Sequence, residues 1–428
     1  MTAIGADVAL PRLLVGCADR AMASLERHLE VHGPVPSPRA LAPKALLDAV
    51  ERSGLRGRGG GAFPTGLKMK AVAGARGRAI VVANGCESEP LSAKDALLLR
   101  ELPHLVLDGA ELAARAVGAD EVILAHESSN PMARLSLEHA LAERREARVD
   151  GVRFELFSAA ERFLTGQETA LVSQINGGPP SPTFIPPRPT DRGVRRRPTL
   201  IQNVETLAHI GLIARHGPEW FRGCGTRAEP GSTLVTLLGA VGNPGVYEIE
   251  RGTPLPAIVA AAGGLAGAAA GLLIGGYFGS WLQPKLLERI ELSNEALAEH
   301  GASLGCGIVV ALPADACPVA ETVRVAIYLA TETARQCGPC VHGTAAIART
   351  LHGIAEGRPS RGAFADLQRW NEELPGRGAC HHPNGLVNFV SSALRVFAPA
   401  FDDHARQGPC DRCVAEPILA VPIAAVRR

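Results

Sequence analysis

The sequence predicts an α/β protein in three parts: a region with a mostly parallel sheet, a small β-rich region and a helical region that carries cysteines. Between residues 40 and 160, apolar runs of strand length alternate with helix-like segments, which is typical of parallel strands joined by helices. Residues 231–315 consist of short strand-like runs separated by glycine turns. From Glu321 onward the apolar spacing is helical and includes cysteines.

The individual elements are expected in the following order. An amphipathic helix near residues 21–31 ends in a proline-rich segment, and a loop rich in proline and arginine at 179–198 leads into a helix at 204–215. Between them we expect strands at 79–83, 121–125 and 152–157 and helices at 105–117 and 132–146. We place domain boundaries at 1–40 (N-terminal helical segment), 41–228 (α/β), 229–316 (β-rich), 317–405 (helical) and 406–428 (tail with a C-x2-C pair).

Composition excludes several functional classes. Lys and Arg number 44 against 43 Asp and Glu, so no overall charge attracts the chain to nucleic acid or anionic lipid. The first twenty residues lack the pattern of a secretory signal peptide, and we expect a cytoplasmic protein. Ten cysteines in a reducing compartment indicate metal or redox chemistry, and four of them form two C-x2-C pairs.

Residues 254–282 carry no charge and are long enough to span a bilayer. They contain seven glycines, however, and follow a strand-like run at 233–239. We therefore expect a buried segment of the β-rich region rather than a membrane helix.

A glycine-rich loop at residues 54–68, GLRGRGGGAFPTGLK, combines six glycines with three cations. Glycines allow backbone N–H groups to turn toward an anion, and Arg56, Arg58 and Lys68 can neutralise phosphate. A flexible basic loop is the alternative. After the strand at 79–83 comes NGCESEP, followed by Lys94 and Asp95. Ligands of parallel sheets bind at the carboxyl ends of strands, so this segment is a candidate binding loop; a solvated turn is the alternative.

These motifs together resemble the NADH-binding flavoprotein subunit of respiratory complex I and the related flavin and iron-sulfur subunits of formate dehydrogenases and hydrogenases. GLRGRGGGAFPTGLK, NGCESEP, TGQETAL at 165–171, PTLIQNVETL at 198–207 and CGPC at 337–340 occur in the family's order, over residues 35–400. The resemblance implies a Rossmann-like FMN-binding domain, a small β-grasp (SLBB) domain and a C-terminal helical iron-sulfur domain.

The resemblance also implies which residues bind FMN. The matching positions are Gly57, Gly59, Gly60, Lys68, Asn84, Glu87, Gly166, Glu168, Asn203 and Thr206. Two nearby positions differ from the family, because Cys86 stands where the family has Asp and Phe163 where it has Tyr. Each change removes a polar group near the flavin and is expected to alter its potential.

The positions that match the family's NADH site are less well kept. Phe63 and Glu89 remain, whereas Ala71 and Arg188 replace two aromatic residues that cage the adenine. Each lost ring pair removes roughly 0.5–1.5 kcal/mol beyond area burial. Further differences lie at Leu91, Ala93 and Ile185. We therefore expect NADH to be a poor direct substrate, although binding of NAD stays open.

The family holds one [4Fe-4S] cluster with four cysteines, and three matching positions here are cysteines. They are Cys337, Cys340 and Cys380, while Ala334 occupies the first position. Thiolates are the usual donors to such clusters. We expect a [4Fe-4S] or [3Fe-4S] cluster that is either left open or completed by a further donor: Cys410, Cys413, His342, His381 or His382.

Other interpretations of the cysteines remain. CGPC is also a thioredoxin-type dithiol sequence, and the two C-x2-C pairs suggest zinc despite the 69 residues between them. Simple buried thiols are the last alternative, and we interpret the following cysteines as core residues: Cys17, Cys224, Cys306 and Cys317.

Two functions follow from these expectations. The first is an oxidoreductase subunit that passes electrons between FMN and a ferredoxin-like or other redox protein subunit, with or without NADH as direct donor, and that associates peripherally with a membrane redox complex. The second is a non-catalytic docking subunit with an impaired cluster. The arginine-rich run at 195–197 is either a solvated loop, a surface that docks an acidic ferredoxin, or a site for a cofactor phosphate.

Overall fold

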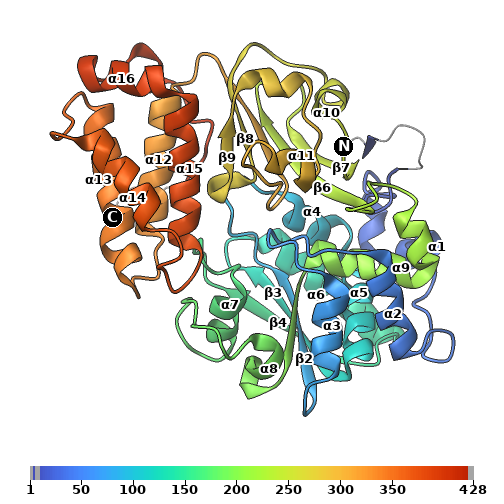
Figure 1. The fold of residues 1–428 in the computed structure, drawn as a ribbon. Coiled ribbons are helices and arrows are strands. Elements are labelled where there is room, and N and C mark those ends of the chain that lie inside the picture. Colours follow the sequence, from blue (N-terminus) through green and yellow to red (C-terminus); the bar gives the residue numbers. More distant parts are fainter. Residues whose placement is uncertain (1–2, 5–9, 423–428) are drawn as a thin grey trace.

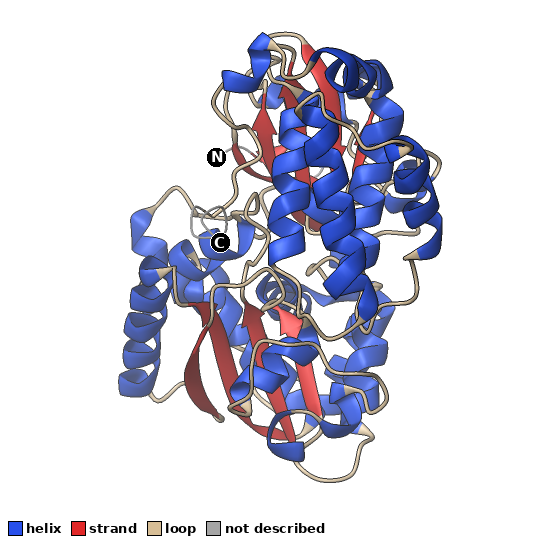
Figure 2. Ribbon diagram, turned by 90° about the vertical axis from the view of Figure 1, so that its left-hand side faces the viewer, coloured by secondary structure: helices blue, strands red, loops and turns tan. Residues whose placement is uncertain are grey.

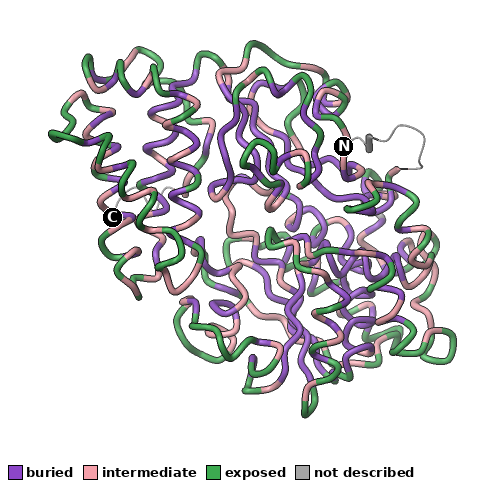
Figure 3. The backbone as a smooth tube through the Cα atoms, in the orientation of Figure 1, coloured by how far each residue is buried: buried purple, intermediate pink, exposed green. Residues whose placement is uncertain are grey.

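The computed structural model describes residues 3–4 and 10–422 and arranges them as a parallel α/β layer, a mixed sheet and a helical bundle (Figure 1). Buried residues concentrate in the two sheets and on the inward faces of the helices (Figure 3). The predicted three-part fold class is confirmed. The predicted domain boundaries stay a prediction.

The α/β layer is a four-stranded parallel sheet in the order β4-β3-β2-β5. Alternate side chains point to its two faces, so Val81 and Val122 pack under the main helical layer while Ile80 and Ile123 pack on the other face. Burial on both faces explains why these strands are continuous apolar runs in the sequence. The strands are β2 (Ala79–Gly85), β3 (Ala119–Glu127), β4 (Arg153–Ala159) and β5 (Thr199–Asn203).

Helices cover both faces of this sheet. The larger layer contains α2 (Pro43–Ser53), α3 (Thr65–Ala73), α4 (Lys94–Glu101), α5 (Pro103–Val117), α6 (Pro131–Ala147) and α9 (Val204–Arg222). On the other face lies α7 (Glu168–Ile175), with α8 (Pro189–Arg192) following it in the chain. The predicted strands and helices of this region are all present. β5 was not predicted, because its five residues follow directly on the proline- and arginine-rich loop.

The N-terminal segment packs on the same helical layer through η1 (Arg20–Ala23) and α1 (Leu25–His32). His28 on α1 lies 2.7 Å from the buried carboxylate of Asp108 on α5. Arg144 donates to the other oxygen of Asp108 at 2.7 Å, and Arg215 donates to this carboxylate as well. One buried anion therefore ties four helices together.

The mixed sheet has the order β1-β7-β6-β10-β8-β9. Its strands are β1 (Ala3–Ile4), β6 (Ser232–Gly239), β7 (Gly245–Glu250), β8 (Ala269–Ile274), β9 (Ser280–Leu282) and β10 (Ile308–Pro313). Its short helices are α10 (Leu255–Ala261), η3 (Gly276–Phe278), η4 (Pro284–Glu288) and α11 (Asn294–Ala298). The uncharged segment at 254–282 forms α10, β8, η3 and β9, as expected. Among the described residues, no helix is long and apolar enough to cross a membrane.

The helical bundle covers one face of the mixed sheet, where Leu273, Val310 and Leu312 point toward it (Figure 2). It consists of α12 (Pro318–Thr331), the short π-helical turn η5 (Pro339–Gly343), α13 (Thr344–Ala355), α14 (Ala363–Glu373), α15 (His382–Val396), α16 (Ala398–Gln407) and η6 (Asp411–Val414). The chain after η6 runs back along α12, where the backbone N–H groups of Ile418 and Leu419 donate to Glu321 at 3.2 and 2.8 Å.

Candidate functional site

The carboxyl ends of β2 and β5 bring two of the predicted flavin residues side by side. Asn84 and Asn203 are paired in register at the ends of these parallel strands. The Asn84 amide donates to the Gly166 carbonyl at 2.9 Å, which joins the loop before α7 to the same place. Asn203 is also the N-cap of α9, where its side chain accepts from the Glu205 N–H at 3.0 Å.

The glycine-rich loop between α2 and α3 folds back over this edge. The Gly57 N–H donates to the Phe63 carbonyl at 2.9 Å, and the Arg58 N–H donates to Thr206 Oγ1 at 2.9 Å. Gly59 packs against Asn203, since a Cβ on Gly59 would lie 3.3 Å from the Asn203 Cβ. The loop is therefore fastened to the start of α9 by backbone contacts that only a small residue permits.

Next to these contacts, the loop leaves its backbone open to a cavity of about 270 Å³. A Cβ on Gly60 would meet its nearest atom at 3.9 Å, and a Cβ on Gly61 would meet none within 4 Å. Gly57, Gly60 and Gly61 all line the cavity, together with Lys94. This open glycine cradle beside a cation and a helix N-terminus fits the phosphate end of a flavin nucleotide.

Two cations of the glycine-rich loop, Arg58 and Lys68, contact other protein groups. Arg58 is buried, and its guanidinium donates to the Ser232 carbonyl at 3.0 Å and lies 3.9 Å from Glu205. Its burial lowers the pKa of Arg58 to about 10. Arg58 also lines the 270 Å³ cavity, and its part as a phosphate ligand stays a prediction. Lys68 instead forms an ion pair with Glu168, so two predicted flavin residues contact each other.

Lys94 is the buried cation of this edge, and sequence reasoning gave it no role of its own. Its Nζ lies 2.6 Å from Asp95, 3.0 Å from Glu205 and 3.3 Å from Asn203 Oδ1. Burial opposes its charge, but the carboxylates of Asp95 and Glu205 outweigh this effect and raise the pKa of Lys94. Its ammonium group is therefore permanently charged.

Glu87 binds the start of α4, next to Lys94. Its two carboxylate oxygens accept from the backbone N–H groups of Asp95 at 3.0 Å and Ala96 at 2.8 Å, at the first turn of α4. A carboxylate at a helix N-terminus compensates the positive end of the helix dipole. Glu87 therefore orients the segment that carries Lys94, and it also lines the larger cavity described next.

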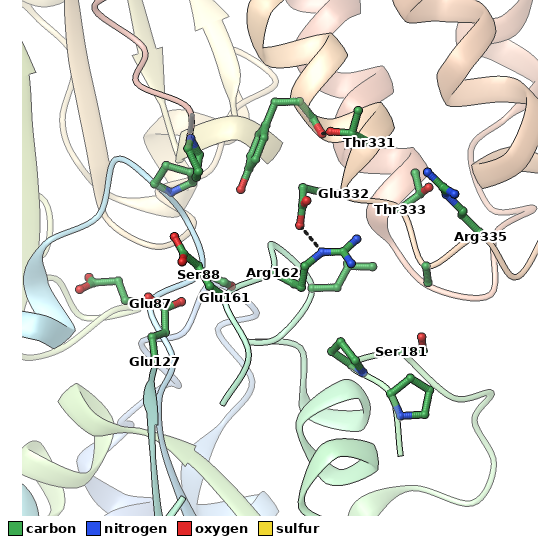
Figure 4. Close-up of a pocket in the computed structure, with 17 residues that line it drawn as sticks. Glu87, Ser88, Glu127, Glu161, Arg162, Ser181, Thr331, Glu332, Thr333 and Arg335 are labelled. Carbon is green, nitrogen blue, oxygen red and sulfur yellow. Dashed lines mark hydrogen bonds and ion pairs between the residues drawn. The ribbon is translucent and has the colours of Figure 1, made fainter. Parts of the chain in front are cut away.

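The larger cavity, of about 480 Å³, lies between the α/β layer and the helical bundle (Figure 4). This volume is within the range usual for cofactor and substrate sites. Its polar lining is mainly acidic: Glu87, Glu127, Glu161 and Glu332, with Arg162 and Arg335. Arg162 donates to Glu332 at 2.8 Å. Burial, reinforced by the charges of Glu87 and Glu161, raises the pKa of Glu127 to about 7.

The two predicted NADH residues are placed differently from each other. Phe63 is 50% exposed beside the glycine loop, so its ring is available for stacking. Glu89 turns toward the mixed sheet, where one carboxylate oxygen accepts the Tyr277 N–H at 2.9 Å. Ser88 and Pro90 line the larger cavity, whereas Glu89 is not part of its lining. Burial raises the pKa of Glu89 to about 8.

The three predicted cluster cysteines come together beyond the end of α12. Cys337 comes two residues before η5, Cys340 is its second residue, and Cys380 comes two residues before α15. Burial raises the pKa of Cys340, and the neighbouring sulfurs of Cys337 and Cys380 raise it further, so the three thiols are within electrostatic reach of one another. Ala334 lines the 480 Å³ cavity. Three thiols with an open fourth position fit an incompletely ligated iron-sulfur cluster.

The histidines near these thiols differ in their surroundings. His342 and His381 are exposed, whereas His382 is 1% exposed. His382 Nε2 lies 2.7 Å from the Leu329 carbonyl and must donate to it, because a carbonyl oxygen only accepts. Its Nδ1 is then an unprotonated nitrogen, buried and without a hydrogen-bond partner. The His382 ring packs edge-on against Phe163 and Phe278, so which of the three histidines offers iron a fourth ligand stays a prediction.

The two remaining cysteine candidates are in another part of the bundle. Cys410 and Cys413 cluster with Cys317, which precedes α12, whereas Cys337 follows its far end. A helix of 14 residues is about 21 Å long. The option that Cys410 or Cys413 closes the cluster is therefore wrong, and so is zinc shared by both C-x2-C pairs. Cys317 is buried as expected but is not a simple core residue.

Comparison with known proteins agrees with this arrangement. Residues 50–212 match the family model described as the Nuo51 FMN-binding domain, residues 234–274 match the SLBB domain, and residues 320–404 match the NADH-ubiquinone oxidoreductase-F iron-sulfur binding region. The chain is 30% identical to an F-type subunit of the NADH-quinone oxidoreductase of Rhizobium meliloti, over 86% of this chain and 90% of that protein. It is 29% identical to the NADP-reducing hydrogenase subunit HndC of Solidesulfovibrio fructosivorans, over 90% and 80%.

A solved structure shares the fold as well. The crystal structure of an NAD+-reducing [NiFe]-hydrogenase in the H2-reduced state superimposes with a TM-score of 0.82 at 30% identity, covering 94% of this chain and 68% of that one. The three family models thus match in order along the chain, and these relatives cover most of it. The chain belongs to the family of F-type subunits of NADH-quinone oxidoreductases, whose members are FMN- and iron-sulfur-containing oxidoreductase subunits.

Proposed function

We propose that this chain passes electrons between an FMN held at the glycine-rich loop and a partner redox subunit, through an iron-sulfur cluster held by Cys337, Cys340 and Cys380. The observation that carries the proposal is the position of the 480 Å³ cavity, which is lined by Glu87 from the flavin side and by Ala334 from the cysteine side. When bound, FMN takes up two electrons together and can release them singly, and the cluster accepts one electron at a time.

In this proposal the chain's own residues hold the two groups in place. The backbone of Gly57 and Gly60 and the ammonium of Lys94 face the phosphate of the flavin nucleotide. The remaining proposed flavin residues are Gly59, Lys68, Asn84, Glu87, Gly166, Glu168, Asn203 and Thr206. The Lys68–Glu168 ion pair is expected to open when the flavin binds, because both side chains belong to the same set.

The flavin part is tested at Gly61, where a side chain has room in the free protein. Gly61→Leu should fold normally but fill the cavity next to the glycine cradle. We expect at least a tenfold loss of FMN affinity, measured by fluorescence quenching of added FMN. The matched control is Gly267→Leu, at an exposed glycine where an added Cβ would likewise meet no atom within 4 Å, and this variant should bind FMN normally. Equal affinity in both variants would contradict the assignment.

The cluster part is tested by restoring the missing ligand. Since Ala334 stands at the position that matches the family's first ligand and lines the cavity, a cysteine at position 334 is expected to place a fourth thiol beside the other three. Ala334→Cys should raise the iron and sulfide content toward about four of each per chain and replace a [3Fe-4S] resonance by that of a reduced [4Fe-4S] cluster. Cys380→Ser should lose the cluster, whereas Cys224→Ser, a buried cysteine elsewhere, should keep it.

The fourth ligand of the natural chain is tested at His382. If its Nδ1 closes the cluster, His382→Ala should shift the paramagnetic resonance spectrum and lower the iron content, while His381→Ala, at an exposed position, leaves both unchanged. An unchanged spectrum in His382→Ala would show that the fourth iron is open toward the cavity or absent.

We further propose that NADH is a poor direct reductant. Ala71 and Arg188 cannot form the adenine cage, and four glutamates line the larger cavity, where a pyrophosphate would meet like charge. Anaerobic mixing of FMN-loaded protein with NADH should therefore bleach the flavin slowly or not at all. Rapid bleaching at micromolar NADH would restore the dehydrogenase interpretation, with Phe63 and Glu89 as its substrate residues.

The identity of the partner follows from what the relatives are. Two relatives are named as subunits, one of a quinone oxidoreductase and one of a hydrogenase, so we propose a redox subunit of an oligomeric enzyme as partner, ferredoxin-like or otherwise. The arginine run is a weak docking candidate, because Arg195 binds Glu121 at 2.7 Å and Arg197 binds Asp120 at 2.6 Å. A cytoplasmic location and a peripheral position on a membrane redox complex stay predictions.

The missing cysteine keeps a second candidate function open, namely a docking subunit without electron transfer. It predicts that wild-type protein purified under argon and reconstituted with FMN, iron and sulfide holds neither flavin nor cluster. Bound flavin together with a reducible cluster would exclude it.

A further inference from the structure

Four metal-binding side chains meet at the end of the bundle that lies away from the predicted cluster. They are Cys317 before α12, His404 on α16, and Cys410 and Cys413 on either side of the first turn of η6. Their ligand atoms all lie within 4.8 Å of one another. Within the described residues, no other group of three or more such side chains lies this close together.

The distances between the ligand atoms fit one tetrahedral ion. Cys410 Sγ and Cys413 Sγ are 3.8 Å apart, and His404 Nε2 lies 3.4 Å from Cys317 Sγ and 3.9 Å from Cys413 Sγ. Zinc bonds of about 2.3 Å to sulfur and 2.0–2.1 Å to nitrogen in a tetrahedron give ligand separations of about 3.5–3.8 Å. A disulfide between Cys410 and Cys413 would need about 2.05 Å. A cubane cluster binds each cysteine to a different iron and would spread the sulfurs further apart.

The surroundings of the histidine select the correct nitrogen for a metal. His404 Nδ1 lies 3.1 Å from the Ala355 carbonyl, so this nitrogen carries the hydrogen and Nε2 presents its lone pair to the sulfurs. His404 and Cys317 are each 2% exposed. The Cys317 sulfur accepts the Ala320 N–H at 3.4 Å, which holds this side chain at the start of α12.

The two C-terminal cysteines are held in a tight turn typical of metal knuckles. The Cys413 N–H donates to the Cys410 carbonyl at 2.9 Å, and Gly408 enters the turn with a φ of 81°, a left-handed conformation that favours glycine. Three thiols and one imidazole in a closed tetrahedron are the ligand set of a structural zinc site rather than a catalytic one.

We propose that Cys317, His404, Cys410 and Cys413 bind a single zinc ion that fastens the C-terminal segment to the start of α12. Beyond the site, the segment is guided along α12 by Glu321, which accepts the N–H groups of Ile418 and Leu419. Tyr277 then donates to the Ala420 carbonyl, and Pro422 lines the 480 Å³ cavity. The ion therefore anchors a strap whose end forms part of the wall of the proposed redox site.

The proposal is tested by metal analysis of the full-length protein, prepared without a polyhistidine tag. Plasma mass spectrometry should find about one zinc per chain in addition to iron. Cys410→Ser/Cys413→Ser should lower zinc more than tenfold and leave iron unchanged. Cys337→Ser should lower iron and keep zinc, and the control Cys17→Ser, another buried cysteine, should keep both. Wild type without zinc, or a double variant that keeps it, would overturn the site.

A second measurement decides the question if the double variant fails to fold. Zinc-edge X-ray absorption of the wild type should show three sulfurs at about 2.3 Å and one nitrogen at about 2.0–2.1 Å. A shell of oxygen and nitrogen alone would mean an adventitious ion and would overturn the proposal. Hydrogen exchange of residues 416–422 should be more than tenfold faster in a folded zinc-free variant such as His404→Ala, and unchanged exchange would refute the strap.

Discussion

Replacement of Glu89 by glutamine should change the stability of the protein, relative to wild type, in the favourable direction between pH 5 and pH 8. Glu89 follows β2 and reaches into the mixed sheet, where Oε2 accepts the Tyr277 N–H at 2.9 Å. Its other oxygen, Oε1, is buried and has no hydrogen-bond partner. Burial raises the pKa of this carboxyl from 4.5 to about 8, although two backbone N–H groups work in the opposite direction. The ionised form therefore destabilises the fold.

The magnitude follows from linkage between protonation and folding. Each unit of pKa difference corresponds to about 1.36 kcal/mol, so ionisation of Glu89 costs the folded state about 4 kcal/mol at pH 8 and about 1 kcal/mol at pH 5. The cost is absent well below the unfolded pKa, grows as pH rises from there to the folded pKa, and is constant above it. We halve the difference between the costs at pH 8 and pH 5 to about 2 kcal/mol, because water penetration and local movement lower the energetic cost of a buried charge. In a cooperative unit of 150–250 residues this corresponds to roughly 4–8 °C in melting temperature.

The assay is thermal unfolding of wild type and Glu89→Gln at the two pH values and one ionic strength, without added cofactors. The glutamine amide also lacks a partner at the Oε1 position, which costs about 1–3 kcal/mol at both pH values. The informative quantity is therefore the melting temperature of Glu89→Gln minus that of wild type, compared between pH 5 and pH 8. Glu146→Gln, at an exposed helix end, is the control and should show no such change. An equal effect of Glu89→Gln at both pH values would refute the buried-carboxylate explanation.

Two further predictions concern the core of the α/β layer. Asp108→Asn should lower the free energy of unfolding by about 3–5 kcal/mol at pH 7, because it leaves Arg144 and Arg215 short of a buried counter-charge. Burial alone would raise the pKa of Asp108, but His28 and these arginines hold it well below its usual value. The loss measured by urea unfolding should therefore shrink below pH 4, where the wild-type carboxylate loses this advantage. Gly109→Ala would place a Cβ 1.8 Å from the Leu207 carbonyl oxygen, where α5 and α9 cross, and should cost at least about 1–3 kcal/mol in the same assay. Gly267→Ala, where a Cβ would meet no atom within 4 Å, should cost less.

The sequence predicted those elements whose burial is uniform. β2, β3 and β4 are apolar runs between helices, and the structure confirms each within a few residues. β5 was not predicted, because five residues after a proline are too few to show the alternation of a strand. The run of Thr199, Leu200 and Ile201 before an N-capping Asn203 was the available signal, since β-branched and apolar residues there favour a strand.

The chemistry of the site could be predicted only where it is local in sequence. The glycine loop and the strand-end asparagines are such local signals. The role of Arg58 is not, because its partner Ser232 is 174 positions away in the mixed sheet. For the same reason the pairing of Cys317 with His404, 87 positions apart, has no spacing that a sequence pattern could show. The cluster cysteines were found through the family's motif rather than through geometry.

The proposed zinc site and the predicted iron-sulfur cysteines lie at opposite ends of α12. One end of α12 is fixed at Cys317, and the other end leads through Glu332 to Ala334 and the three cluster cysteines. Glu332 accepts both Arg162 and the Phe163 N–H, at 2.8 and 2.9 Å, so this end is also docked on the flavin side. With the proposed zinc at one end and these contacts at the other, α12 would hold the proposed flavin and cluster at a constant distance, on which electron transfer depends. A metal placed far from the electron path can therefore support the path without taking part in it.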